Sequence, residues 1–98
     1  MKIVWSPLSL QQIEEISDYI AVDNRSAACD WIDSIFEKVD VLKTNPEIGR
    51  RVAEIEKPDI RELIHVNYRI IYLYTSKKIL ILTIRHFKQL LPTEEIIR

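Results

Sequence analysis

Residues 60–87 decide the fold of this chain, and they read IRELIHVNYRIIYLYTSKKILILTIRHF. The stretch contains three apolar runs rich in Ile, Leu and Tyr, a composition that indicates β-strands. Val66-Asn67 and Thr75–Lys78 separate the runs and predict two turns. Connections this short join strands that run in opposite directions. We therefore predict an antiparallel meander of three strands.

Successive side chains of a strand point to opposite faces of the sheet, and both faces of this meander are largely apolar. In the second strand, Tyr68, Ile70, Tyr72 and Tyr74 oppose Arg69, Ile71 and Leu73. In the third strand, Leu80, Leu82, Ile84 and His86 oppose Ile79, Ile81, Thr83 and Arg85. One face must be covered by helices. We expect the other face to keep exposed apolar surface that needs a partner.

The first half of the chain predicts a short strand and the two helices that supply this layer. Residues 2–5 (KIVW) predict the strand, and Ser6-Pro7 has the pattern of an N-cap followed by proline at the first helical position. We expect the first helix to extend to about Val22, because apolar residues recur at helical spacing at Leu10, Ile13, Ile16 and Ile20. We expect the second helix to begin at a Ser26 cap and to end at Asn45-Pro46. Its apolar residues at helical spacing are Ala28, Ile32, Ile35, Val39 and Leu42. The link Asp23-Asn24-Arg25 is short enough to make the helices an antiparallel hairpin.

The remaining segments complete a single domain. Residues 46–59 (PEIGRRVAEIEKPD) show no clear period and hold two prolines and the only glycine, so we predict a surface loop. Leu90–Arg98 predict a weakly helical tail. The predicted fold class is α+β in the order β-α-α-β-β-β, with a helix hairpin packed on a small, largely antiparallel sheet. A length of 98 residues suits one domain, residues 1–98.

The net charge of −1 hides an uneven distribution. Residues 1–49 carry 4 Lys/Arg against 9 Asp/Glu, whereas residues 50–98 carry 10 against 6. The chain therefore has an acidic front half and a basic back half, which favours an anionic partner. The small net charge argues against a protein whose main task is to coat nucleic acid.

Cysteine and histidine are too few to predict a metal site. Cys29 is the only cysteine, and we expect it to be a small buried side chain of the second helix. His65, near a turn, is expected at the surface, and His86 is the second and last histidine. We expect no metal and no cofactor. The sequence has no apolar run long enough to cross a membrane, so we expect a cytoplasmic protein without a membrane partner.

Several cations interrupt the apolar strands of residues 60–87. Arg61 lies in the first strand, Arg69 in the second, and Arg85-His86 end the third. Burying an unpaired arginine costs several kcal/mol, so these side chains need carboxylates or a bound anion. Arg61 is expected to pair with Glu14 or Asp18 of the first helix. For Arg69, an internal ion pair and an anion-binding role both stay open. Trp5 and Trp31, like the tyrosines of the second strand, are expected in the core.

With these residues, the order of elements resembles the RelE/ParE family of bacterial toxins from type II toxin–antitoxin modules. Four segments carry the resemblance in this order: WSPLSLQQIEEISDYIA, AACDWIDSIFEKVDVLKTNPEIGRRV, RELIHVNYRIIYLY and ILILTIRH. The AA-x-x-WI start of the second helix and the RH end of the last strand are closer to the ParE branch. The resemblance implies a toxin that a cognate antitoxin holds inactive, within a higher-order toxin–antitoxin assembly.

The two branches of the family imply different targets. A ParE-like toxin poisons DNA gyrase by binding. We expect Arg61, Arg69, Tyr72 and Phe87 to be binding residues. A RelE-like toxin cuts mRNA on the ribosome, with Arg69, Arg85 and His86 as the implied catalytic residues. Phe87 stands where many ribonuclease members have a tyrosine, and phenylalanine cannot transfer a proton. A third alternative is a protein without toxicity that binds an antitoxin as co-repressor.

Overall fold

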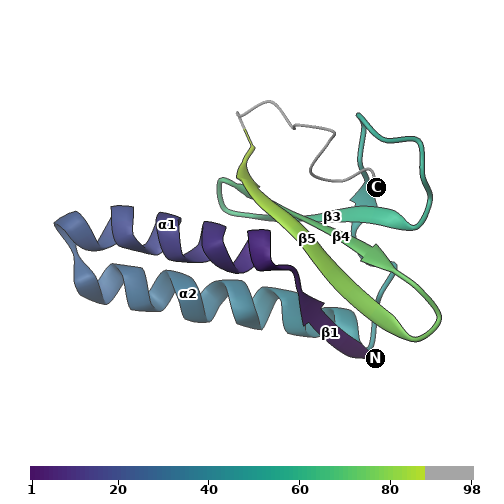
Figure 1. The fold of residues 1–98 in the computed structure, drawn as a ribbon, viewed down its shortest axis with the longest axis horizontal. Helices are drawn as coiled ribbons and strands as arrows, with labels where there is room; N and C mark the ends of the chain where they lie inside the picture. Colours follow the sequence, from purple (N-terminus) through teal and green to yellow (C-terminus); the bar gives the residue numbers. More distant parts are fainter. Residues whose placement is uncertain (88–98) are drawn as a thin grey trace.

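A computed structural model of the chain describes residues 1–87, and Figure 1 shows its fold. The expected tail at Leu90–Arg98 lies outside the described residues. The elements are β1 (Lys2–Trp5), α1 (Pro7–Asp23), α2 (Arg25–Asp40), a 3₁₀ turn η1 (Val41–Lys43), β2 (Arg50–Arg51), β3 (Ile60–His65), β4 (Tyr68–Tyr74) and β5 (Lys78–His86). The predicted order and the α+β class are confirmed.

The strands form a five-stranded sheet in the order β1-β5-β4-β3-β2. The meander β3–β4–β5 is antiparallel, as predicted, whereas β1 pairs with β5 in parallel. β2 lies inside the segment that was expected to be only a loop, and it pairs with β3 at Arg50↔Glu62 and Arg51↔Arg61. A strand of two residues is too short to produce a period in the sequence, which explains why the prediction missed it.

The helix hairpin begins and ends largely as the sequence indicates. The Ser6 hydroxyl accepts the Ser9 N–H at 3.0 Å, which confirms the predicted N-cap of α1. The predicted cap of α2 at Ser26 is wrong, because the Asn24 side chain accepts the Ala27 N–H at 3.0 Å instead. Asn24 has an extended backbone and is the single residue between the helices, so it ends α1 and starts α2. α2 also ends earlier than predicted, at Asp40, and continues as η1.

One hydrophobic core fills the space between the hairpin and the sheet. Ile13 of α1 and Ile35 and Val39 of α2 contact residues of three strands and η1 there. The other buried residues of this cluster are Leu42, Leu63, Ile70, Tyr72, Ile79, Ile81 and Ile84. Trp5 and Trp31 pack against its edge and are partly buried. Two helix expectations are wrong: Leu10 is 48% exposed, and Cys29 is exposed, because both lie off the stripe that faces the sheet.

A second core lies on the opposite face of the sheet. Residues 52–60, which we call the strap, place Val52, Ile55 and Ile60 against Ile71 and Leu82. Val52 and Ile55 are 2% and 5% exposed. The expectation that this face stays open for a partner is therefore corrected, since much of it is covered by the chain's own strap. The irregular spacing of the strap residues gave no sign of this role.

A β-bulge in β5 changes which side chains face the helices. Ile71 lies opposite Thr83, but the next residue, Tyr72, lies opposite Ile81, so Leu82 is an extra residue. Ile84 consequently joins the core beneath the helices, on the side of Ile79 and Ile81. Strict alternation had placed Ile84 with Leu80 and Leu82, and that prediction is wrong.

Candidate functional site

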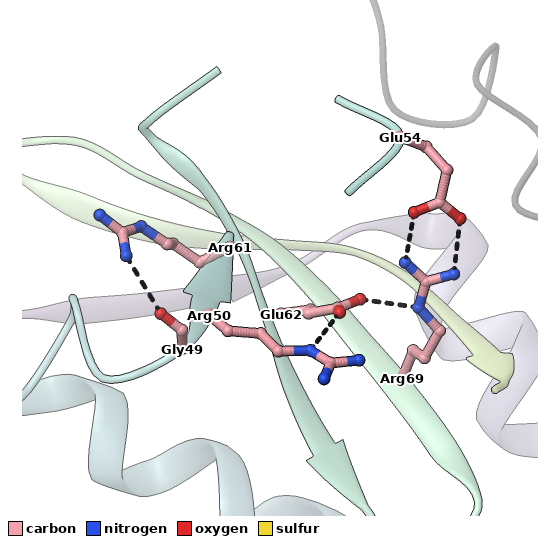
Figure 2. Close-up of polar contacts among 6 residues, drawn as sticks. All are labelled: Gly49, Arg50, Glu54, Arg61, Glu62 and Arg69. Carbon is pink, nitrogen blue, oxygen red and sulfur yellow. Dashed lines mark hydrogen bonds and ion pairs between the residues drawn. The ribbon is translucent and has the colours of Figure 1, made fainter. Parts of the chain in front are cut away.

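The predicted cation Arg69 lies on β4, on the face that the strap covers. Figure 2 shows its guanidinium between two glutamates. Nε donates to Oε1 of Glu62 at 2.7 Å, while Nη1 and Nη2 donate to the two carboxylate oxygens of Glu54 at 2.9 Å each. The Arg69 side chain is only 8% exposed. A fork-shaped pair of this kind gives strong and directional hydrogen bonds.

Glu62 is the centre of this network. Its side chain, on β3, is 2% exposed, and its second oxygen accepts from Nε of Arg50 at 2.6 Å. The network therefore contains two arginines and two glutamates, so its formal charges cancel. This balance allows charged side chains to lie beside an apolar core without an external counter-ion.

The network shifts the pKa values of its members in the directions that ion pairing predicts. Hydrogen bonds from Arg69 hold the pKa of Glu54 below its usual range, against the opposing effect of burial. The same hydrogen bonds, together with the one that Arg69 donates to Glu62, raise the pKa of Arg69. Both groups are therefore charged at neutral pH.

Arg61 does not pair with the acidic helix residues proposed from the sequence. Its Nε donates to the Pro58 carbonyl at 3.0 Å, and its Nη1 donates to the Gly49 carbonyl at 3.3 Å. β3 is separated from β5, on which α1 packs, by β4. Arg61 thus lies two strands away from the part of the sheet on which α1 packs, and it connects the strap to the turn before β2 instead.

Tyr72 and Phe87, two of the suggested binding residues, differ in exposure. Tyr72 is fully buried, and its hydroxyl accepts the Gly49 N–H at 2.9 Å and donates to the Pro46 carbonyl at 2.8 Å. It therefore serves the protein's own backbone. Phe87 is 46% exposed. It borders a cleft of about 370 Å³ that Arg50, Arg51 and the Arg69 network also line.

Arg85 and His86 end β5 on opposite faces of the sheet. The register places Arg85 opposite Arg69 and His86 opposite Tyr68, and paired residues project from the same face. The His86 ring lies 5.6 Å from the Tyr68 ring and stacks on Phe87 at 5.3 Å. Tyr68 packs against the helix-side core. His86 is therefore on the helix side, and Arg69 and Arg85 are on the strap side.

A second cleft, of about 450 Å³, separates α1 from the adjoining ends of β4 and β5. Arg85 and His86 contribute to its lining, together with Gln11 and Glu15 of α1. Arg69 does not line this cleft. The three residues implied by the ribonuclease alternative are thus divided between two clefts, and one of the three is already neutralised by carboxylates.

His65 is half-buried rather than fully at the surface, and its Nε2 lies 2.9 Å from the Ser34 hydroxyl. Residues 1–87 contain no group of three or more His, Cys, Asp or Glu side chains placed to hold a metal ion. Within the same residues, no helix is both long enough and apolar enough to span a membrane.

The sequence did not identify Glu54 and Glu62, the partners of Arg69. Glu62 had a signal that could have been used: it is an acidic residue inside the apolar strand IRELIH, next to Leu63 and two positions from Ile60. A charge in such a strand usually has a partner. Glu54 had no comparable signal, because its contact depends on the path of the strap.

Comparisons with known proteins agree with the fold. The family model described as "ParE toxin of type II toxin-antitoxin system, parDE" matches residues 3–91. A solved structure titled "Chromosomal ParDE TA system from P. aeruginosa" superimposes with a TM-score of 0.74 at 24% identity, over 90% of this chain and 97% of the other. This likeness shows a shared fold. No curated protein matches the chain.

Proposed function

Because the chain belongs to the ParE family of type II toxin–antitoxin toxins, we propose that it arrests growth by poisoning DNA gyrase and that a cognate antitoxin neutralises it. It would act by binding gyrase and trapping the enzyme on cleaved DNA, without a catalytic step of its own. The same module would stabilise a plasmid that encodes it, since cells that lose the plasmid also lose the antitoxin.

The neutralised Arg69 is the observation that carries the proposal. A ribonuclease of this fold would need cationic side chains available to the charge that develops on the phosphate. All three guanidinium nitrogens of Arg69 already bond to Glu54 and Glu62. The placement of His86 and Arg69 on opposite faces supports the same conclusion. A toxin that acts by binding needs neither arrangement.

We propose that the antitoxin covers the cleft beside Phe87. The cleft combines an exposed aromatic ring with the exposed arginines Arg50 and Arg51. A disordered segment with apolar and acidic side chains would gain hydrophobic contacts and ion pairs by folding there. Copies of such a complex could join into a higher-order assembly through the antitoxin.

Purified gyrase provides the direct test. The toxin should inhibit supercoiling and increase the amount of cleaved DNA held by gyrase, and prior addition of the antitoxin should prevent both effects. Absence of any effect at micromolar toxin would contradict the proposal.

Mapping of mRNA ends after induction tests the ribosome alternative. Cuts in the ribosomal A site that disappear in Arg85→Ala and His86→Ala would establish a ribonuclease instead. Harmless overexpression with intact antitoxin binding would indicate a co-repressor.

A further inference from the structure

The end of the helix hairpin presents a pair of apolar side chains that are largely exposed to solvent. Figure 1 shows the connection between α1 and α2 at one end of the molecule, beyond the strands. Tyr19 and Val22, in the last turns of α1, are 81% and 83% exposed. They are three residues apart, so they lie side by side on the helix surface. The buried residues of α1, such as Ile13 and Ser17, occupy a different face.

Three carboxylates surround this pair. Glu15 and Asp23 each lie four residues from Tyr19, and Asp18 lies four residues from Val22, so all belong to one arc of α1. We call Glu15, Asp18, Tyr19, Val22 and Asp23 the hairpin-tip surface. All five side chains are exposed.

No cation of residues 1–87 forms an ion pair with these carboxylates. Glu15 accepts a hydrogen bond from Gln11 at 3.0 Å. The last turn of α1 holds no basic residue, and Asp23 lies at the negative end of the helix dipole. Arg25, the nearest cation in the sequence, is exposed at the start of α2. Among the residues that the structure describes, no ion pair therefore neutralises the negative charge around the apolar pair, which suits an external basic partner.

We infer that the hairpin-tip surface docks onto a basic, DNA-binding surface of the enzyme that the toxin poisons. The inference rests on the proposed function. An enzyme that holds DNA must present Lys and Arg side chains to phosphates, and such a surface complements the three carboxylates. Tyr19 supplies the type of side chain that most often anchors an interface. Nucleic acid itself is repelled by this charge, so a protein is the occupant.

The surface can be changed without disturbing the core, which makes the test direct. Tyr19→Ser with Val22→Ser removes the apolar pair, and Asp18→Asn with Asp23→Asn removes charge at nearly constant volume. Ile48→Ser with Glu56→Gln is the matched control, since Ile48 is 59% exposed and Glu56 is also exposed, and both lie outside the hairpin. Circular dichroism and thermal unfolding would verify that every variant folds.

Binding to purified gyrase and inhibition of supercoiling are the two measurements. The apolar double variant should lose about 10- to 100-fold in affinity, as expected when two interface anchors are truncated. The charge variant should lose affinity at low salt and little at about 1 M salt, where the Debye length is about 3 Å. The control and the wild-type chain should agree within about twofold, and all variants should bind the antitoxin equally.

The outcomes separate the inference from the proposed function. A wild-type toxin without effect on gyrase would contradict the proposed function, and the inference with it. If the wild type inhibits gyrase and the hairpin-tip variants inhibit it equally well, only the inference is wrong. Loss of antitoxin affinity in these variants would assign the surface to the antitoxin. Binding of duplex DNA alone that depends on Tyr19 would also overturn the inference.

Discussion

Arg69 depends on partners from three different segments of the chain. Glu62 comes from β3, Glu54 from the strap, and Arg50, which shares Glu62, from β2. A buried guanidinium that loses a partner keeps its charge, because its pKa is far above any working pH. The two glutamates therefore contribute to stability mainly by preventing an uncompensated buried cation.

Replacing Glu54 with alanine tests this role. The variant leaves Nη1 and Nη2 of Arg69 without acceptors, and we expect it to lower the free energy of unfolding by about 1 to 3 kcal/mol. The value is below that for a fully buried pair because the Glu54 side chain is 39% exposed. Glu56→Ala is the control, since Glu56 is exposed, and its change should stay within about 0.5 kcal/mol. Urea denaturation measures both, and equal values would contradict the role of Glu54.

The same contact predicts an acid dependence of stability. The pKa of Glu54 is lower in the folded chain than its ordinary value of 4.5, chiefly because of the hydrogen bonds from Arg69. A depressed pKa means that the contribution is fully present above the unfolded value and is lost as the pH falls through the folded value. Stability should thus hold from neutral pH to about pH 5 and fall below it. Glu54→Gln removes one titrating carboxylate, so the free energy of unfolding should decrease less steeply as the pH falls. An unchanged slope would contradict the assignment of this pH dependence to Glu54.

At the scale of elements, the bulge in β5 is fixed by α1. The Ser6 hydroxyl donates to the Leu82 carbonyl at 2.9 Å, and Oε1 of Gln12 accepts the Ile84 N–H at 2.7 Å. The Thr83 hydroxyl also bonds to the Gln12 amide. A bulge leaves backbone groups outside the strand ladder, and these side chains satisfy them. The first turns of α1 are thereby attached to one point of the sheet.

Gln12→Ala should therefore destabilise the fold more than most substitutions of a polar residue do. The substitution leaves the buried Ile84 N–H and the Thr83 hydroxyl with fewer hydrogen-bond partners. We therefore expect it to lower the free energy of unfolding by about 1 to 3 kcal/mol. Gln11→Ala is the neighbouring control, because the exposed Gln11 bonds only to Glu15, and its cost should be about 0.5 kcal/mol or less. Thermal unfolding compares them. Faster amide exchange at Ile84 in Gln12→Ala would locate the effect at the bulge, and a neutral Gln12→Ala would refute it.

The sequence was sufficient to predict the helices and strands that have a regular hydrophobic pattern. It was not sufficient to predict contacts that depend on a single residue. The apolar steps in α1 and α2 and the Ile- and Tyr-rich runs of β3, β4 and β5 were sufficient to predict the layers. The bulge at Leu82 was missed because both neighbours are apolar, so either alternation looks plausible. Arg69 was identified as a charged residue needing a partner, but Glu54 reaches it only through the strap. The strap itself has too few apolar residues to show a period.

At the scale of the whole molecule, charge is separated between layers. Residues 7–40, which form the hairpin, contain eight acidic and two basic side chains. On the strap side of the sheet, Arg50 and Arg69 are paired with glutamates. The hairpin thus carries an excess of negative charge, whereas two cations of the basic half, Arg50 and Arg69, are neutralised by the chain's own glutamates. A binding toxin with this layout would attract basic surfaces at long range and repel nucleic acid.

Asp23→Asn tests whether this charge is kept at the expense of stability. Asp23 is the last residue of α1, where a negative charge opposes the helix dipole, so its removal should raise the free energy of unfolding by about 0.3 to 1 kcal/mol at low salt. High salt should abolish the gain. Asp33→Asn, in the middle of α2 and also exposed, is the control and should have a smaller effect. Urea denaturation at two salt concentrations provides the measurement. If Asp23→Asn is more stable and also binds gyrase more weakly, the acidic tip is explained by its partner. A variant that is less stable would show instead that Asp23 has a structural role within the hairpin.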